Sequence, residues 1–200
     1  MQGGMDTAAP QELFSHIRIV MGMVIGLGIT RMLLGIAGFI QHPGRNRVSL
    51  LHMLWVGSIL LELVLFWWWE FALSRISSWS FGVFLFLIGY AVVLYLLAAL
   101  LFPDSISEYA GYEDFFIKRR RWFFGLLAVA FVLDVVDTLI KGLDHWSQLS
   151  GDYLVQVPIG LAFCLVGSIW AQRRLQIAIA LIHIAYQCYW IIRILSAMHG

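Results

Sequence analysis

Residues 122–140 read WFFGLLAVAFVLDVVDTLI, an apolar run interrupted by two aspartates, Asp134 and Asp137. At 1.5 Å per residue, a helix of this length covers roughly 28 Å, close to the ~30 Å thickness of the hydrocarbon core of a bilayer. The run does not alternate between apolar and polar residues as a membrane β-strand would. The stretch therefore predicts a transmembrane helix that carries charge into the membrane.

Five further stretches have the same character, and together they fill most of the chain. Of the 200 residues, 61% are hydrophobic and only 12% are charged, whereas a soluble domain has about a quarter of its residues charged. We predict an all-α, polytopic membrane protein with short loops, in which residues 1–200 form one transmembrane domain. The six predicted spans cover residues 17–40, 50–69, 79–102, 122–140, 153–171 and 175–195.

The distribution of Lys and Arg predicts the orientation of these spans. The first, third and fifth loops carry eight such residues and the opposite side carries four. The positive-inside rule then places both termini on the outer, periplasmic side of a bacterial inner membrane. The eight residues are Arg45, Arg47, Lys118, Arg119, Arg120, Arg121, Arg173 and Arg174.

The third loop is the longest polar interruption of the chain. Within it, the Ser105-x-x-Glu108 pattern predicts a capped, short interfacial helix ahead of the basic residues. These basic residues flank an apolar run, so we expect them to contact anionic lipid. The net charge of +1 and this clustering argue against a nucleic-acid partner.

Four charged residues lie deep inside predicted spans, where charges are rare and are functional candidates by default. Counted from the cytoplasmic end, Arg31 is roughly 14 Å deep, Glu62 and Asp134 roughly 18 Å, and Asp137 roughly 22 Å. An arginine side chain is long enough to span this difference in depth between Arg31 and the carboxylates. We therefore expect Arg31 and the three carboxylates to meet in one layer.

Two helical faces are expected to pack against this layer. Gly28, Gly35 and Gly38 share one face of the first helix with Arg31, which predicts close approach of another helix. The sixth span carries a polar stripe, and Tyr186 lies beside it. The stripe consists of Gln176, His183, Gln187 and Trp190.

The buried charges support two interpretations. In the first, Arg31 is the only deep fixed cation and forms a structural ion-pair network that locks three helices together. In the second, three carboxylates exceed one arginine, and an unpaired buried carboxylate takes up a proton or binds a cation, as a conduction pathway requires. Lys141 lies four residues after Asp137, so it is a competing partner for that carboxylate.

Cofactor and catalytic signatures are weak. No two histidines have the i, i+4 spacing of a metal-binding helix, so no metal site is predicted. A haem held by His52 and His183 is a third hypothesis, although their depths differ by roughly 9 Å. No Gly-x-Ser-x-Gly is present, and neither Cys164 nor Cys188 has a histidine at helical spacing. An enzymatic role is therefore not favoured, and the sequence does not identify a cofactor.

Two functional hypotheses remain ahead of a haem protein or intramembrane enzyme. The first is a small channel or transporter for protons or a monovalent cation, which uses Arg31, Glu62, Asp134, Asp137, His183 and Gln187. The second is a non-enzymatic membrane scaffold or subunit that binds a protein partner, a lipid or further copies of itself. In the second hypothesis the buried charges serve the fold alone.

Overall fold

A computed structural model describes residues 8–42, 48–75 and 79–199. Within these ranges there is no strand, and six helices are each long and apolar enough to cross a membrane. The chain is therefore an all-α, multi-pass membrane protein. The helices are α1 (Ala8–Gln41), α2 (Leu50–Trp69), α3 (Phe81–Leu101), α4 (Tyr112–Ile140), α5 (Leu143–Ile169) and α6 (Arg173–His199), and a short 3-10 helix, η1 (Glu70–Arg75), follows α2.

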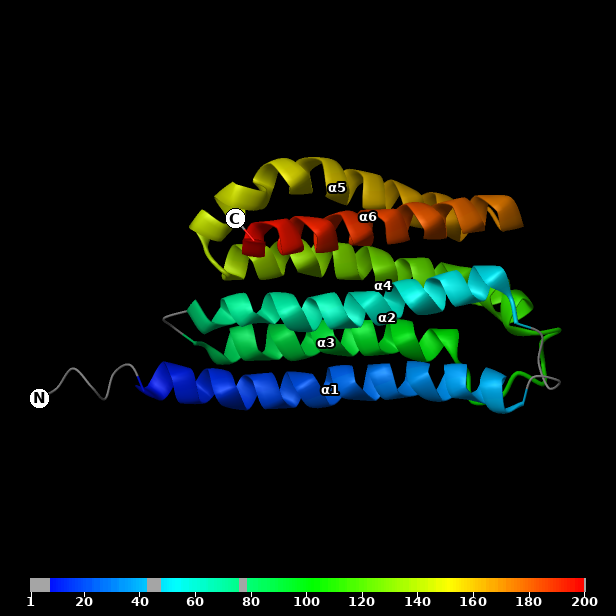
Figure 1. The fold of residues 1–200 in the computed structure, drawn as a ribbon, viewed down its shortest axis with the longest axis horizontal. Coiled ribbons are helices and arrows are strands. Elements are labelled where there is room, and N and C mark those ends of the chain that lie inside the picture. The colour runs from blue at the N-terminus through cyan, green and yellow to red at the C-terminus, as the bar shows by residue number, and fades with distance from the viewer. Residues whose placement is uncertain (1–7, 43–47, 76–78, 200) are drawn as a thin grey trace, which may run out of the picture.

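The six helices run up and down in a bundle, with α1 along one edge and α5 along the other (Figure 1). Helix α1 packs against α2 and α3, α4 against α3 and α5, and α6 against α2. We call the end where α1 begins and α6 ends the terminal end. The opposite end holds the described basic residues of the predicted cytoplasmic loops, and we call it the basic end. Its residues are Lys118, Arg119, Arg120, Arg121, Arg173 and Arg174.

Helix α4 begins earlier than expected. The predicted capped helix at residues 105–108 is wrong: that segment is not helical, and the Ser105 hydroxyl accepts the backbone N–H of Ser107 and lies 2.9 Å from the Ser107 hydroxyl. The chain instead turns at Gly111, whose φ of 148° favours glycine, and α4 starts at the next residue. Glu113 and Asp114 lie in its first turn, where the helix dipole favours negative charge. The basic residues 118–121 are consequently part of α4 itself.

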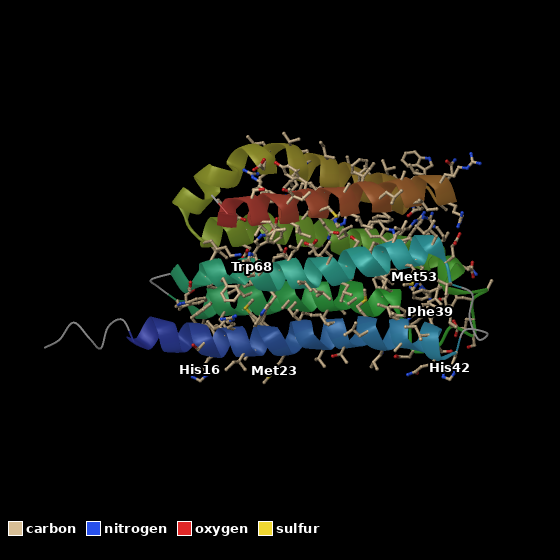
Figure 2. All side chains as sticks on the ribbon, in the orientation of Figure 1. His16, Met23, Phe39, His42, Met53 and Trp68 are labelled. Atoms are coloured by element: carbon tan, nitrogen blue, oxygen red, sulfur yellow. The ribbon has the colours of Figure 1, made fainter. Side chains whose placement is uncertain are left out.

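Apolar side chains cover the outside of the bundle as well as its interior. On α1, Met23 is 64% exposed and points away from the other helices (Figure 2). Trp68, on α2, is also exposed. A monomer in water rarely exposes so much apolar surface, but the hydrocarbon of a bilayer would cover it. The interior toward the basic end is packed by aromatic rings. This aromatic cluster consists of Trp55, Phe116, Phe123 and Phe124.

The glycines of α1 differ in their surroundings. A methyl group added at Gly28 would lie 3.4 Å from Leu63, in ordinary contact, whereas one at Gly35 would overlap the Phe102 ring. A methyl at Gly38 would meet nothing within 4 Å. Close packing is thus present at Gly28 and Gly35, and Gly38 lies beside open space.

This difference makes a matched test. We expect Gly35→Ala to lower the free energy of unfolding by about 1–3 kcal/mol, because the added methyl must displace the Phe102 ring. Gly38→Ala makes the same chemical change on the same helix and should be neutral or slightly stabilising. Unfolding in mixed micelles measures both variants. Equal stability of the two would contradict the close contact between α1 and α3.

Candidate functional site

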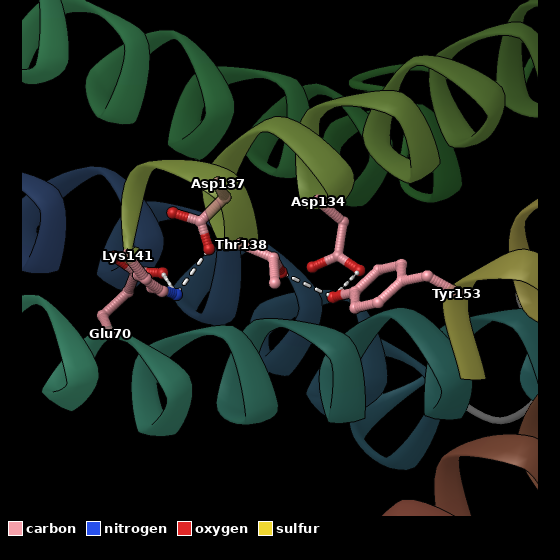
Figure 3. A network of polar contacts seen from close by, with 6 residues as sticks. All are labelled: Glu70, Asp134, Asp137, Thr138, Lys141 and Tyr153. Carbon is pink, nitrogen blue, oxygen red and sulfur yellow. Dashed lines mark hydrogen bonds and ion pairs between the residues drawn. The ribbon is translucent and has the colours of Figure 1, made fainter. Parts of the chain in front are cut away.

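The terminal end of the bundle holds a buried ion-pair triad (Figure 3). The Lys141 ammonium donates to Glu70 Oε1 at 3.0 Å and to Asp137 Oδ2. All three side chains are at most 4% exposed. The i, i+4 spacing on α4 aligns Lys141 with Asp137, and η1 brings in Glu70 directly after α2. The triad therefore joins α2 to α4.

Lys141 follows the last residue of the α4 span. Burial alone would lower the pKa of Lys141, but attraction to Asp137 and Glu70 raises it above its ordinary value. The side chain therefore stays an ammonium and supplies one fixed positive charge to this region.

A second group of polar contacts joins α4 to α5. The Tyr153 hydroxyl donates to Asp134 Oδ2 at 2.9 Å and lies 2.7 Å from Thr138 Oγ1 (Figure 3). Asp134 and Thr138 are one turn apart on α4, so the tyrosine bridges two positions of the same helical face. This contact brings the start of the α5 span next to the acids of α4.

A third group joins α2 to α6. The Gln187 amide donates to Glu62 Oε2 at 2.7 Å and to the backbone oxygen of Ser58 at 3.1 Å. The Ser58 hydroxyl lies 2.7 Å from His183 Nδ1 and donates to Gln187 Oε1 at 3.1 Å. Two residues of the polar stripe expected on α6, His183 and Gln187, thus meet α2 through direct hydrogen bonds. The other two do not: Gln176 donates to the backbone oxygens of Gly167 and Trp170, and Trp190 donates to Tyr186 on the same helix.

Two cavities connect these groups. A cavity of about 200 Å³ is lined by Asp134, Asp137, Lys141 and Tyr153. A much narrower one of about 30 Å³ is lined by Glu62, Asp134, His183 and Gln187. Asp134 lines both cavities, so it lies between the ion-pair triad and Glu62. The cavities also share Trp69, Gln156, Tyr186 and Trp190.

Negative groups outnumber positive ones here. We use the name acid cluster for four carboxyl groups, those of Glu62, Glu70, Asp134 and Asp137, which lie beside one cation of the described residues, Lys141. In the part of the chain that the structure describes, Lys141 pairs with Glu70 and Asp137, whereas Glu62 and Asp134 form no ion pair. Glu62 and Asp134 are half-buried within membrane-spanning helices, where a carboxylate without a cation is costly and is relieved by a proton or a bound cation. The cluster can therefore hold labile protons.

Arg31 does not join the acid cluster, and the expected pairing was wrong. Its guanidinium donates to the backbone oxygen of Phe102 at 2.6 and 3.0 Å and to Asp104 at 2.5 Å. Helix α3 ends at Leu101, so this carbonyl lies at the negative pole of a helix and lacks a helical partner. The long side chain reaches that site and the 90% exposed Asp104 at the basic end. Lys141 takes the role expected of Arg31.

The histidines of the haem hypothesis are both engaged. His52 Nε2 donates to the backbone oxygen of Leu101 at 2.7 Å, and His183 binds Ser58. Across residues 8–42, 48–75 and 79–199, no group of three or more metal-binding side chains is present. Interhelical hydrogen bonds therefore account for the observed positions of both histidines.

Glu70, Ser58 and Tyr153 belong to the site although sequence reasoning did not select them. Glu70 follows three tryptophans at the end of an apolar run, so it resembles the polar boundary of a span. Tyr153 is the first residue of the fifth predicted span and resembles an interfacial aromatic anchor. The one available signal was Lys141, whose i, i+4 spacing indicated the pair with Asp137.

No family model, curated protein or solved structure matches this chain.

Proposed function

We propose that this multi-pass membrane protein conducts protons through the acid cluster. One observation carries the proposal: Asp134 lines both cavities of the site and binds the Tyr153 hydroxyl, but it pairs with no cation among the residues that the structure describes. A group in that position can accept a proton from one side and release it to the other. Intramembrane carboxyl groups of this kind are typical of proton relays.

The proposed route begins at the terminal end, at Asp137 and Lys141. It continues through Thr138 and Tyr153 to Asp134, along hydrogen bonds of 2.7 and 2.9 Å. From Asp134 the narrow cavity leads to Glu62, which is linked through Gln187 to Ser58 and His183. Each of these groups can donate or accept a proton or a hydrogen bond. By the positive-inside rule, protons would enter from the outer side.

Toward the basic end, the proposed route next meets the aromatic cluster. Trp55 lies next to His183, with ring centroids 5.7 Å apart, and packs edge-on against Phe123 and Phe124. These rings carry no group that relays protons, apart from the indole N–H of Trp55. The proposal therefore includes a gate at this layer, which must rearrange for a proton to complete its passage.

Purified protein in liposomes tests the proposal. A potassium diffusion potential set by valinomycin drives protons inward, and an enclosed pH dye reports them. We expect acidification above that of protein-free vesicles, and we expect it to persist when sodium replaces other external cations. Absence of acidification across a broad range of pH and potential would remove the proposal.

Tyr153→Phe tests the route itself. The variant removes the hydroxyl that bridges Thr138 and Asp134 but keeps the ring, so we expect proton uptake to fall at least ~10-fold while the protein stays folded. Tyr95→Phe is the control, because Tyr95 lies on α3 and does not line the cavities described above. Unchanged uptake in Tyr153→Phe would place the route elsewhere.

The alternative, a non-enzymatic scaffold or subunit, is favoured by the buried triad. Lys141 binds acids from two segments, an arrangement that fastens helices whether or not protons move. In that case neutralising Asp134 would change stability or assembly with a membrane partner, and wild-type liposomes would show no uptake. The flux measurement therefore separates the two functions.

A further inference from the structure

A larger cavity lies on the other side of His183, between α4, α5 and α6. It measures about 360 Å³, within the range of sites for small organic molecules. We call it the α5–α6 cavity. Its lining includes Phe131, Phe163, Cys164, Ile179, Tyr186 and Tyr189.

The lining of the α5–α6 cavity combines aromatic faces with hydrogen-bond acceptors. Trp55 and Phe124 add further rings, and no Lys or Arg belongs to the described lining. Trp190 also lines the cavity, but the Arg193 guanidinium lies over its ring, 4.9 Å from the centroid. Its one carboxylate, Asp152, is paired with Arg193 at 2.5 Å. Gln156 also lines the cavity, and its buried Oε1 accepts no hydrogen bond from the described residues. Aromatic faces and an unpaired carbonyl oxygen both favour a cation that carries N–H groups.

The α5–α6 cavity adjoins the acid cluster. Gln156, His183 and Tyr186 line both this cavity and the narrow one that contains Glu62 and Asp134. Those two carboxyl groups have no paired cation in the described chain. A cation bound at the inner wall of the cavity would favour the ionised form of these acids, and the low dielectric there strengthens the attraction between the two charges.

We propose that the α5–α6 cavity binds an amphipathic organic amine in its protonated form. Its apolar body lies among the aromatic rings, and its ammonium points toward Gln156 and Asp134. The proposal rests on the charge and lining of the cavity and holds whether or not the acid cluster conducts protons. A lipid acyl chain would also fill apolar space, but it would gain nothing from the neighbouring acids.

The test compares two probes of the same shape with purified, detergent-solubilised protein. 2-(1-Naphthyl)ethylamine is protonated at neutral pH, and 2-(1-naphthyl)ethanol is not charged. Calorimetric titration, referenced to protein-free micelles, should show the amine binding at least ~10-fold more tightly, because cation–π contact and the nearby acids act on the charged probe alone. Asp134→Asn should weaken binding of the amine and leave binding of the alcohol unchanged.

Gly151→Leu provides a second test that leaves the acids untouched. Gly151 lines the cavity, and a Cβ added there meets nothing within 4 Å, so we expect leucine to be accommodated, to take up part of the cavity and to weaken binding of both probes. Gly125→Leu is the matched control, since Gly125 is equally unobstructed on α4 but lies outside the cavity lining.

Three outcomes would overturn the proposal. These are equal affinity for amine and alcohol, displacement of both by oleate, and no binding of either. The first two would identify an apolar or lipid site, and the third would leave no ligand of this class. Amine binding without proton uptake would reject the proposed conduction and keep the amine site. Proton uptake without amine binding would reject the amine site and keep the proposed conduction.

Discussion

Asp134→Asn is expected to abolish proton uptake into liposomes. The substitution keeps the size of the side chain and its ability to accept from Tyr153, but asparagine cannot take up and release a proton. Because Asp134 is the one described carboxyl group that lines both cavities, its loss interrupts the proposed route between Asp137 and Glu62. We expect a decrease of at least ~100-fold, the scale on which a positioned proton-transfer group acts.

Two controls accompany this variant. Glu108→Gln also removes one negative charge, but Glu108 is exposed near the basic end and should leave uptake unchanged. Asp134→Glu retains a carboxyl group and should restore part of the activity. If Asp134→Asn is folded and conducts as well as the wild-type protein, Asp134 is not on the route.

Lys141→Met is expected to cause the largest loss of stability. The variant leaves Glu70 and Asp137 buried without their cation, and removal of one partner from a buried pair costs about 3–5 kcal/mol. The expected result is a lower free energy of unfolding in mixed micelles, or a lower yield of folded protein. Loss of the charge, rather than of packing, should be the cause, because methionine fills most of the volume of lysine.

The same helix offers a matched comparison. Lys118 and Asp114 form an i, i+4 pair on α4 with the spacing of Lys141 and Asp137, but the Lys118 side chain is 56% exposed. Lys118→Met should therefore change stability very little. Combining Lys141→Met with Glu70→Gln and Asp137→Asn should recover much of the loss. Equal costs for Lys118→Met and Lys141→Met would show that burial does not strengthen the triad.

The six helices were predictable because hydrocarbon imposes a length and a composition that can be counted along the chain. The helical faces were also readable: the polar stripe predicted His183 and Gln187, and both meet α2. Spacing along one helix is fixed by its geometry, so Asp137 and Lys141 could be paired from the sequence.

Partners on different helices could not be assigned in the same way. Depth alone placed Arg31 near Glu62, but depth does not say which helices are neighbours or where a long side chain ends. Arg31 binds the end of α3, where the backbone carbonyl of Phe102 has no helical partner. Glu70 lies where the apolar run ends, so composition does not mark it as a deep charge, although η1 continues the chain inside the protein and keeps Glu70 only 3% exposed.

The reversal potential of the purified protein in a planar bilayer tests the central claim most directly. With a pH difference across the bilayer and equal salt on both sides, a proton-selective route predicts a shift of about 59 mV per pH unit. The shift should be absent in Asp134→Asn. A potential that instead follows a sodium or potassium gradient, or no current above that of the bare bilayer, would contradict proton conduction through the acid cluster.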